Sequence, residues 1–182
     1  MNFPVNTYFP THKSEQRRST MKFISNISDF RQNLKIRFSS DNWLQAIDFQ
    51  EFLIVGGCIV NAVCQLPFHD TQQQDINIIN ISSSRVDFET TMKNTIKKLQ
   101  MISLRYTSHQ IKVEKIPGSC HYDIFLPCGI KLNFKHERGQ YSATAISRIL
   151  YNFDMDVCQV AFTGKFIFTC NMSDLLVLMI MS

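Results

Sequence analysis

Long apolar runs are missing from this sequence of 182 residues. The longest covers residues 175–181, whereas a helix that crosses a membrane needs about 20 apolar residues. No secretory signal is readable at the N-terminus, because Asn, Pro and His interrupt its first apolar patches. These absences predict an intracellular, cytoplasmic protein that does not enter a membrane.

Glycine and proline are also scarce, with six and five residues, and this excludes fibrous and low-complexity proteins. By contrast, 45% of the residues are hydrophobic and 15 are Phe, a content typical of a chain with a packed core. The length is sufficient for one domain and too small for two comfortable ones. The sequence therefore predicts a single globular domain.

The six cysteines do not indicate a disulfide framework or a zinc site. No two of them have the two-residue spacing of a zinc knuckle. Cys58, Cys64 and Cys158 lie within apolar runs, and an intracellular compartment keeps thiols reduced. We therefore expect buried, reduced thiols.

The net charge of +4 is concentrated at the N-terminus, since residues 1–26 contain four basic residues and one acidic residue. We expect residues 1–26 to form a flexible basic tail and residues 27–182 to form the domain. Such a tail is able to contact nucleic acid, although a solvated, mobile terminus is the simpler interpretation.

Hydrophobic periodicity predicts alternating strands and helices. The apolar run 52–55 is typical of a strand buried on both faces, and the segment 74–81 alternates around isoleucines, as a second strand would. The segments 58–65 and 88–99 have helical spacing. One further expected helix has Ser28 as its N-cap, with Phe30 and Leu34 among its inward positions. The other expected elements are a helix that begins near Asp41, a helix over 146–153, and strands over 110–116, 122–126, 130–134, 157–162 and 166–169. This order predicts an α/β (α+β) fold, a mixed sheet flanked by helices.

Polar residues at the ends of these strands are the candidates for a site. Gly56 and Gly57 form a turn between a strand and a helix, where a backbone without side chains comes close to a phosphate. Asp75 and Asn77 are two residues apart at the start of the next strand, so their oxygens face the same side, as a Mg²⁺ site requires. Tight turn geometry and strand-entry capping are the simpler alternatives for these residues.

A second pair of acids, Asp154 and Asp156, precedes the expected strand 157–162. This pair would complete a metal site if its strand lay next to the strand that carries Asp75. A solvated turn is again the simpler alternative.

The segments VGGCIVNAVCQLPFHDTQQQDINIINI and YNFDMDVCQVAFTG resemble the polymerase-beta-like nucleotidyltransferase superfamily. More narrowly, they resemble poorly characterised eukaryotic members with Gly-Gly, Asp-x-Asp and Phe-Asp-x-Asp segments. The resemblance implies a nucleotidyltransferase-like fold for residues 27–182. It also implies Mg²⁺ as the metal and a nucleoside triphosphate as the ligand.

By position, the resemblance makes Asp75 the first metal-binding carboxylate and Gly56 and Gly57 the phosphate turn. Asn77 stands where the second aspartate belongs, so the site loses one charge. Asp156, with Asp154 beside it, is our choice for the third carboxylate, and Asp123 is the alternative.

The segment PFHDTQQQ looks like an insertion between the two motifs. His69 and Asp70 within it are possible metal ligands, but a polar surface loop is the simpler interpretation.

Two functions from different classes follow. The first is a metal-dependent enzyme that transfers a nucleotidyl group to an unknown acceptor through Asp75, Asn77 and Asp156. The second is a catalytically degenerate binding or scaffold module of the same fold, because Asn77 would weaken two-metal catalysis. A third, weaker hypothesis is a nucleic-acid-binding protein that works through the basic tail.

Overall fold

A computed structural model describes residues 22–82, 84–106, 109–137, 143–151 and 159–169. The helices are α1 (Ile27–Phe38), α2 (Gly57–Val63), α3 (Arg85–Tyr106) and α4 (Ala143–Tyr151), with the 3₁₀ turns η1 (Ser40–Asn42), η2 (Leu44–Ala46) and η3 (Thr71–Gln73). The strands are β1 (Phe52–Val55), β2 (Ile76–Asn80), β3 (Lys112–Lys115), β4 (His121–Phe125), β5 (Lys131–His136), β6 (Val160–Phe162) and β7 (Ile167–Thr169).

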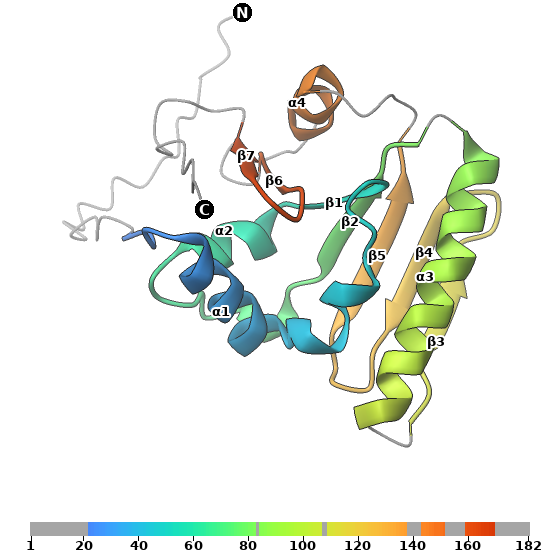
Figure 1. Cartoon of the computed structure of the whole chain (residues 1–182), viewed down its shortest axis with the longest axis horizontal. Helices are drawn as coiled ribbons and strands as arrows, with labels where there is room; N and C mark the ends of the chain where they lie inside the picture. Colours follow the sequence, from blue (N-terminus) through green and yellow to red (C-terminus); the bar gives the residue numbers. More distant parts are fainter. Residues whose placement is uncertain (1–21, 83, 107–108, 138–142, 152–158, 170–182) are drawn as a thin grey trace, which may run out of the picture.

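The seven strands form one sheet in the order β3-β4-β5-β2-β1-β6-β7. Strands β2 and β5 run parallel, and the other neighbouring pairs are antiparallel. The sheet is therefore mixed, and helices flank it, as the sequence predicted (Figure 1).

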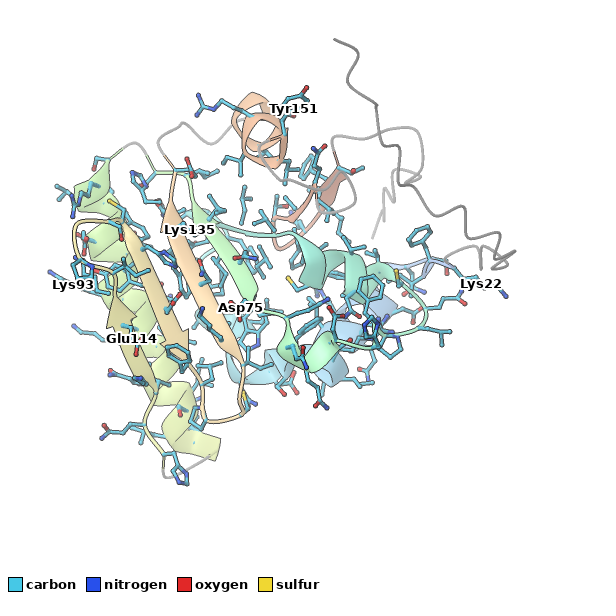
Figure 2. All side chains as sticks on the ribbon, turned by 180° about the vertical axis from the view of Figure 1, so that it is seen from behind. Lys22, Asp75, Lys93, Glu114, Lys135 and Tyr151 are labelled. Carbon is cyan, nitrogen blue, oxygen red and sulfur yellow. The ribbon has the colours of Figure 1, made fainter. Side chains whose placement is uncertain are left out.

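Helices cover the two faces of the sheet unequally. One face packs against α1, α2 and α3 in a large apolar cluster, to which β2 contributes Ile76 and Ile78 and β5 contributes Leu132 and Phe134. On the other face, α4 covers only the part formed by β1, β2 and β6, in a smaller cluster around Val55. Figure 2 looks onto this second face and shows β5 and β4 with α3 behind them. No described helix covers the second face over β5, β4 and β3.

Helix α1 begins two residues earlier than we predicted. Its N-cap is Asn26, whose side chain accepts a hydrogen bond of 2.8 Å from the backbone N–H of Asp29, so Ser28 lies inside the helix. An Asn side chain satisfies an unpaired N–H at a helix start as well as Ser does. The expected inward positions are confirmed, because Phe30 and Leu34 are fully buried.

Residues that we assigned to the end of the tail pair with α2. The backbone N–H of Ile24 donates to Val63 at 2.9 Å, and that of Gln65 donates to Lys22 at 2.8 Å. Residues 22 and 24, which lie before the predicted boundary at residue 26, are therefore hydrogen-bonded to the domain. Residues 1–21 lie outside the described residues.

Other predicted elements are confirmed with shifted bounds. The helical stretch expected near Asp41 is the pair of short turns η1 and η2, and the strand expected over 157–162 is described from Val160 onward. No disulfide joins the cysteines that the structure describes, and Cys58 and Cys64 are buried, as expected. Cys120 is half-buried and Cys128 is exposed, so the expected burial is wrong for these two. Within the described segments, none of the helices combines the length and the apolarity needed to cross a membrane.

Candidate functional site

Backbone pairing aligns polar residues across the uncovered face of the sheet. Asn77 of β2 is the register partner of Val55 on β1 and of Asn133 on β5. Asn133 is in turn the partner of Asp123 on β4. Because register partners point to the same side of a sheet, Asn77, Asn133 and Asp123 share the face on which Val55 packs against α4. We call Asn77, Asn133 and Asp123 the polar row.

Lys131 joins two acids at this row. It lies two residues before Asn133 on β5, so it points to the same face. Its Nζ lies 3.1 Å from Oδ2 of Asp75 and 3.3 Å from Oδ2 of Asp123. The two carboxylate oxygens are therefore no further apart than the sum of these distances. The structure thus brings together two of the four aspartates that the sequence singled out.

These three charged side chains are only partly accessible. Lys131 is 28% exposed and Asp123 is 15% exposed, while Asp75, which precedes β2, is 43% exposed. Burial alone would lower the pKa of the Lys131 ammonium, but its hydrogen bonds to Asp75 and Asp123 outweigh that cost and raise the pKa above its ordinary value. Lys131 therefore carries its positive charge at neutral pH.

Asp123 is engaged through both of its oxygens. Its Oδ1 lies 3.0 Å from Nε2 of His121, which is two residues earlier on the same strand, and its Oδ2 faces Lys131. The ring of Phe125, two residues further along β4, lies under Lys131, with 5.9 Å between the ammonium and the ring centroid. Contacts from β4 thus hold Lys131 on two sides.

The two amides of the polar row carry no charge to offset a cation. Asn133 is 9% exposed, and its Oδ1 has no hydrogen-bond partner among the described residues. Asn77 is half-buried beside it. An amide oxygen is able to accept a hydrogen bond or coordinate a cation, but only weakly compared with a carboxylate.

The glycine turn lies next to the polar row. The last pair of the β1–β2 ladder is Val55 with Asn77, and the chain bends at Gly56 immediately afterwards. Gly56 has φ 86° and ψ −153°, a backbone conformation that favours glycine. A side chain added at Gly57 would meet no atom within 4 Å, so the space above that residue is open. Gly56 and Gly57 therefore form the tight turn between a strand and a helix that we expected.

A buried asparagine holds the loop between the turn and Asp75. Asn61 of α2 donates from Nδ2 to Thr71 at 2.7 Å and to Gln74 at 3.2 Å. These bonds fix the residue directly before Asp75. His69 in this loop is exposed, in agreement with a surface loop.

The acids Asp154 and Asp156 lie outside the described residues, so their assignment stays a prediction. We made it conditional on their strand lying next to the strand of Asp75. Strand β6 pairs with β1, and β1 separates it from β2. Asp123, our alternative, is the acid that the described structure places beside Asp75.

Sequence reasoning missed Lys131, Asn133 and His121. The signal was present, because the segments HYDIF and KLNFKH alternate polar residues with buried apolar ones. Such alternation indicates a strand with one uncovered polar face. The alternation does not indicate which other strands pair with that strand in the sheet.

The described side chains do not fit two magnesium ions. Within the part of the chain that the structure describes, no three His, Cys, Asp or Glu residues are grouped to hold a metal. Asp75 and Asp123 are already bridged by the ammonium of Lys131, and Asn77 and Asn133 add no negative charge. Mg²⁺ is bound in proteins mainly through carboxylate oxygens that are open to it.

No protein-family model matches the chain, and no curated protein matches its sequence. Solved structures to which this chain is similar include those of CCA-adding enzymes. The match to the complex of such an enzyme with CTP covers 84% of this chain and 32% of the enzyme chain, with 15% identity and a TM-score of 0.47. The match to the complex with ATP covers 78% of this chain and 31% of the enzyme chain, with 15% identity and a TM-score of 0.43. The match to the Thermotoga maritima enzyme complexed with tRNA covers 85% of this chain and 32% of the enzyme chain, with 14% identity and a TM-score of 0.38.

The chain thus spans about a third of the length of these structures. At such low identity, no residue of this chain takes a role from those enzymes.

Proposed function

We propose that this chain is a nucleotidyltransferase-fold domain that binds a nucleoside triphosphate on the uncovered face of its sheet, as a binding module that does not transfer the nucleotidyl group. The pairing of Val55 with Asn77 carries the proposal, because it sets the Gly56 bend beside the polar row. Open space above Gly57 leaves room for a phosphate to approach the backbone there.

The charges favour binding over catalysis. A two-metal transfer needs anionic ligands for both cations, and this face offers Asp75 and Asp123 with Lys131 between them. Asn77 occupies the position of the expected second aspartate and is neutral. Without two bound cations, the charge that develops on the leaving pyrophosphate would have no partner of sufficient strength.

Binding of ATP and of CTP to the full chain, measured by isothermal titration calorimetry with and without MgCl₂, tests this proposal. We expect binding in both conditions. Gly57→Val should abolish it, because the new side chain enters the open space above the turn. The melting temperature should change little, since no neighbour lies within 4 Å of the added Cβ. Absence of binding by the wild-type chain, or unchanged binding by Gly57→Val, would contradict the proposal.

A second pair of variants separates the module from an active transferase. Asp75→Ala removes a negative charge beside the ligand, so a binding module should keep its affinity for ATP or gain some. A transferase should lose ATP binding, because Asp75 would hold its metal. Glu137→Ala is the control, since it removes one exposed carboxylate just beyond the end of β5. Binding that requires Mg²⁺ and is lost only in Asp75→Ala would favour the transferase.

A further inference from the structure

Two lysines of β5 point to the same uncovered face but have different surroundings. Lys131 bridges Asp75 and Asp123. Lys135, four residues further along the same strand, is exposed and pairs in register with His121 and Ile79. Figure 2 shows Lys135 and Asp75 on this face. The contrast indicates that the position of Lys131 is specific and does not arise from the strand alone.

We infer that the ammonium of Lys131 is a built-in cation that takes the place of a divalent metal between Asp75 and Asp123, and that it closes this site to Mg²⁺ in the wild-type chain. The inference deepens the proposed function and rests on it, because it explains how this face would hold a nucleotide without metal. It concerns the same site and names Lys131 as a positioning residue.

The distances carry the inference. Mg²⁺ bound to carboxylate oxygens lies about 2.0–2.1 Å from each of them, and an ammonium donates hydrogen bonds to them from about 3 Å. Lys131 Nζ meets both carboxylates at 3.1 and 3.3 Å. A divalent ion in contact with the same two oxygens would lie within a few ångströms of this ammonium, and two cations so close repel each other strongly.

The surroundings of Lys131 support its position between the two acids. Its ammonium lies 5.9 Å from the centroid of the Phe125 ring, and Asn133, two residues further along the same strand, is buried. Removing the ammonium would leave two carboxylates facing each other across a short gap, with the amides of the polar row and the imidazole of His121 beside them. That arrangement is one that binds a divalent cation.

The test is isothermal titration calorimetry, in which MgCl₂ alone is titrated into the full chain. Lys131→Met keeps much of the side-chain volume and removes the charge, and Lys135→Met is the matched control on the same strand and face. We expect no saturable binding by the wild-type chain or by Lys135→Met. Lys131→Met should bind Mg²⁺ saturably, at least about tenfold more tightly than the weakest binding that the titration detects, because one positive charge between two carboxylates is gone. Adding Asp75→Asn to Lys131→Met should abolish the gain.

Thermal unfolding provides a second readout. MgCl₂ should raise the melting temperature of Lys131→Met and leave those of the wild type and of Lys135→Met unchanged. If Lys131→Met does not fold without metal, recovery of its far-UV circular dichroism on refolding in MgCl₂ supports the inference. The same titration is repeated with Lys131→Gln, which removes the charge and keeps a hydrogen-bond donor, and this variant should also gain Mg²⁺ binding.

Saturable binding of Mg²⁺ by the wild-type chain that Asp75→Asn removes would overturn the inference. So would folded Lys131→Met and Lys131→Gln proteins that gain no binding. Because no nucleotide enters this titration, its outcome is distinct from a failure of the chain to bind ATP.

Discussion

Asn77 on β2 and Asn133 on β5 are register partners on parallel strands, so two neutral amides lie side by side in the polar row. Asp123 pairs with Asn133 on the other side. Among the acids near this face, Asp75 and Asp123 both contact Lys131. This distribution of charge leads to the first prediction.

Changing both asparagines to aspartates should create a metal site and should lower the stability of the protein when no metal is bound. In Asn77→Asp/Asn133→Asp, two new carboxylates join Asp123 in the polar row, and the one at residue 133 is buried, so we expect a loss of about 2–4 kcal/mol in the free energy of unfolding without metal. Urea denaturation with and without MgCl₂ measures this loss and its recovery.

Asn94→Asp is the control, because Asn94 is exposed on α3. A double variant that is as stable as the wild type and indifferent to MgCl₂ would show that the row is more open to water than the burial of Asn133 indicates.

The second prediction concerns Arg37 of α1, which holds the end of α2. Its guanidinium donates to the carbonyl of Asn61, to that of Cys64 at 3.0 Å and to that of Gln65 at 2.9 Å. Burial lowers the pKa of Arg37, which remains charged in spite of this. Arg37→Ala leaves these helix-end carbonyls without their donor and should cost about 2–3 kcal/mol in urea denaturation.

Arg37→Lys should recover little of that loss, since one ammonium does not reach several carbonyls with the planar fork of a guanidinium. Arg31→Ala, which removes a single bond of 3.3 Å from the same helix, is the control. Equal losses for the two alanine variants would argue against a special role of Arg37.

The fold could be predicted from the sequence to a large extent, because its signals are local. The uninterrupted apolar residues at 52–55 and the helical spacing of Phe88, Met92 and Leu99 depend only on neighbours along the chain, and the structure buries all of them. The site was predictable only in part. Asp75 and Asn77 reveal themselves by their two-residue spacing, whereas the role of Lys131 depends on β5 lying between β2 and β4. That strand order is set by long-range packing, which no local pattern encodes.

The third prediction is a loss of stability in acid that depends on Glu89. Burial alone would raise the pKa of this carboxyl group, but hydrogen bonds from Lys115 and Tyr122 outweigh it and lower the pKa below its ordinary value of 4.5. A lowered pKa in the folded state stabilises the protein above pH 4.5, and this contribution is lost as the pH falls through the folded value.

Melting temperatures measured between pH 7 and pH 3, by differential scanning fluorimetry, check this dependence. We expect Glu89→Gln to be less stable than the wild type at pH 7 and to approach it at the acidic end, because the wild-type carboxylate is then protonated. Glu114→Gln, on the exposed strand β3, should leave the wild-type profile unchanged. A constant difference between Glu89→Gln and the wild type at all pH values would contradict the prediction.

The last prediction concerns Gly164, in the turn between β6 and β7. Its φ of 84° favours glycine, and a Cβ added there would come within 2.6 Å of the Phe49 ring. That ring packs edge-on against Phe162, with 5.3 Å between the ring centroids. Gly164→Ala therefore combines backbone strain with a clash, and we expect it to cost about 2–4 kcal/mol in the free energy of unfolding. Gly118→Ala is the matched control, because Gly118 has φ 74° and open space around its added Cβ. Its cost should be about 1 kcal/mol, and similar costs for the two variants would show that Phe49 moves aside freely.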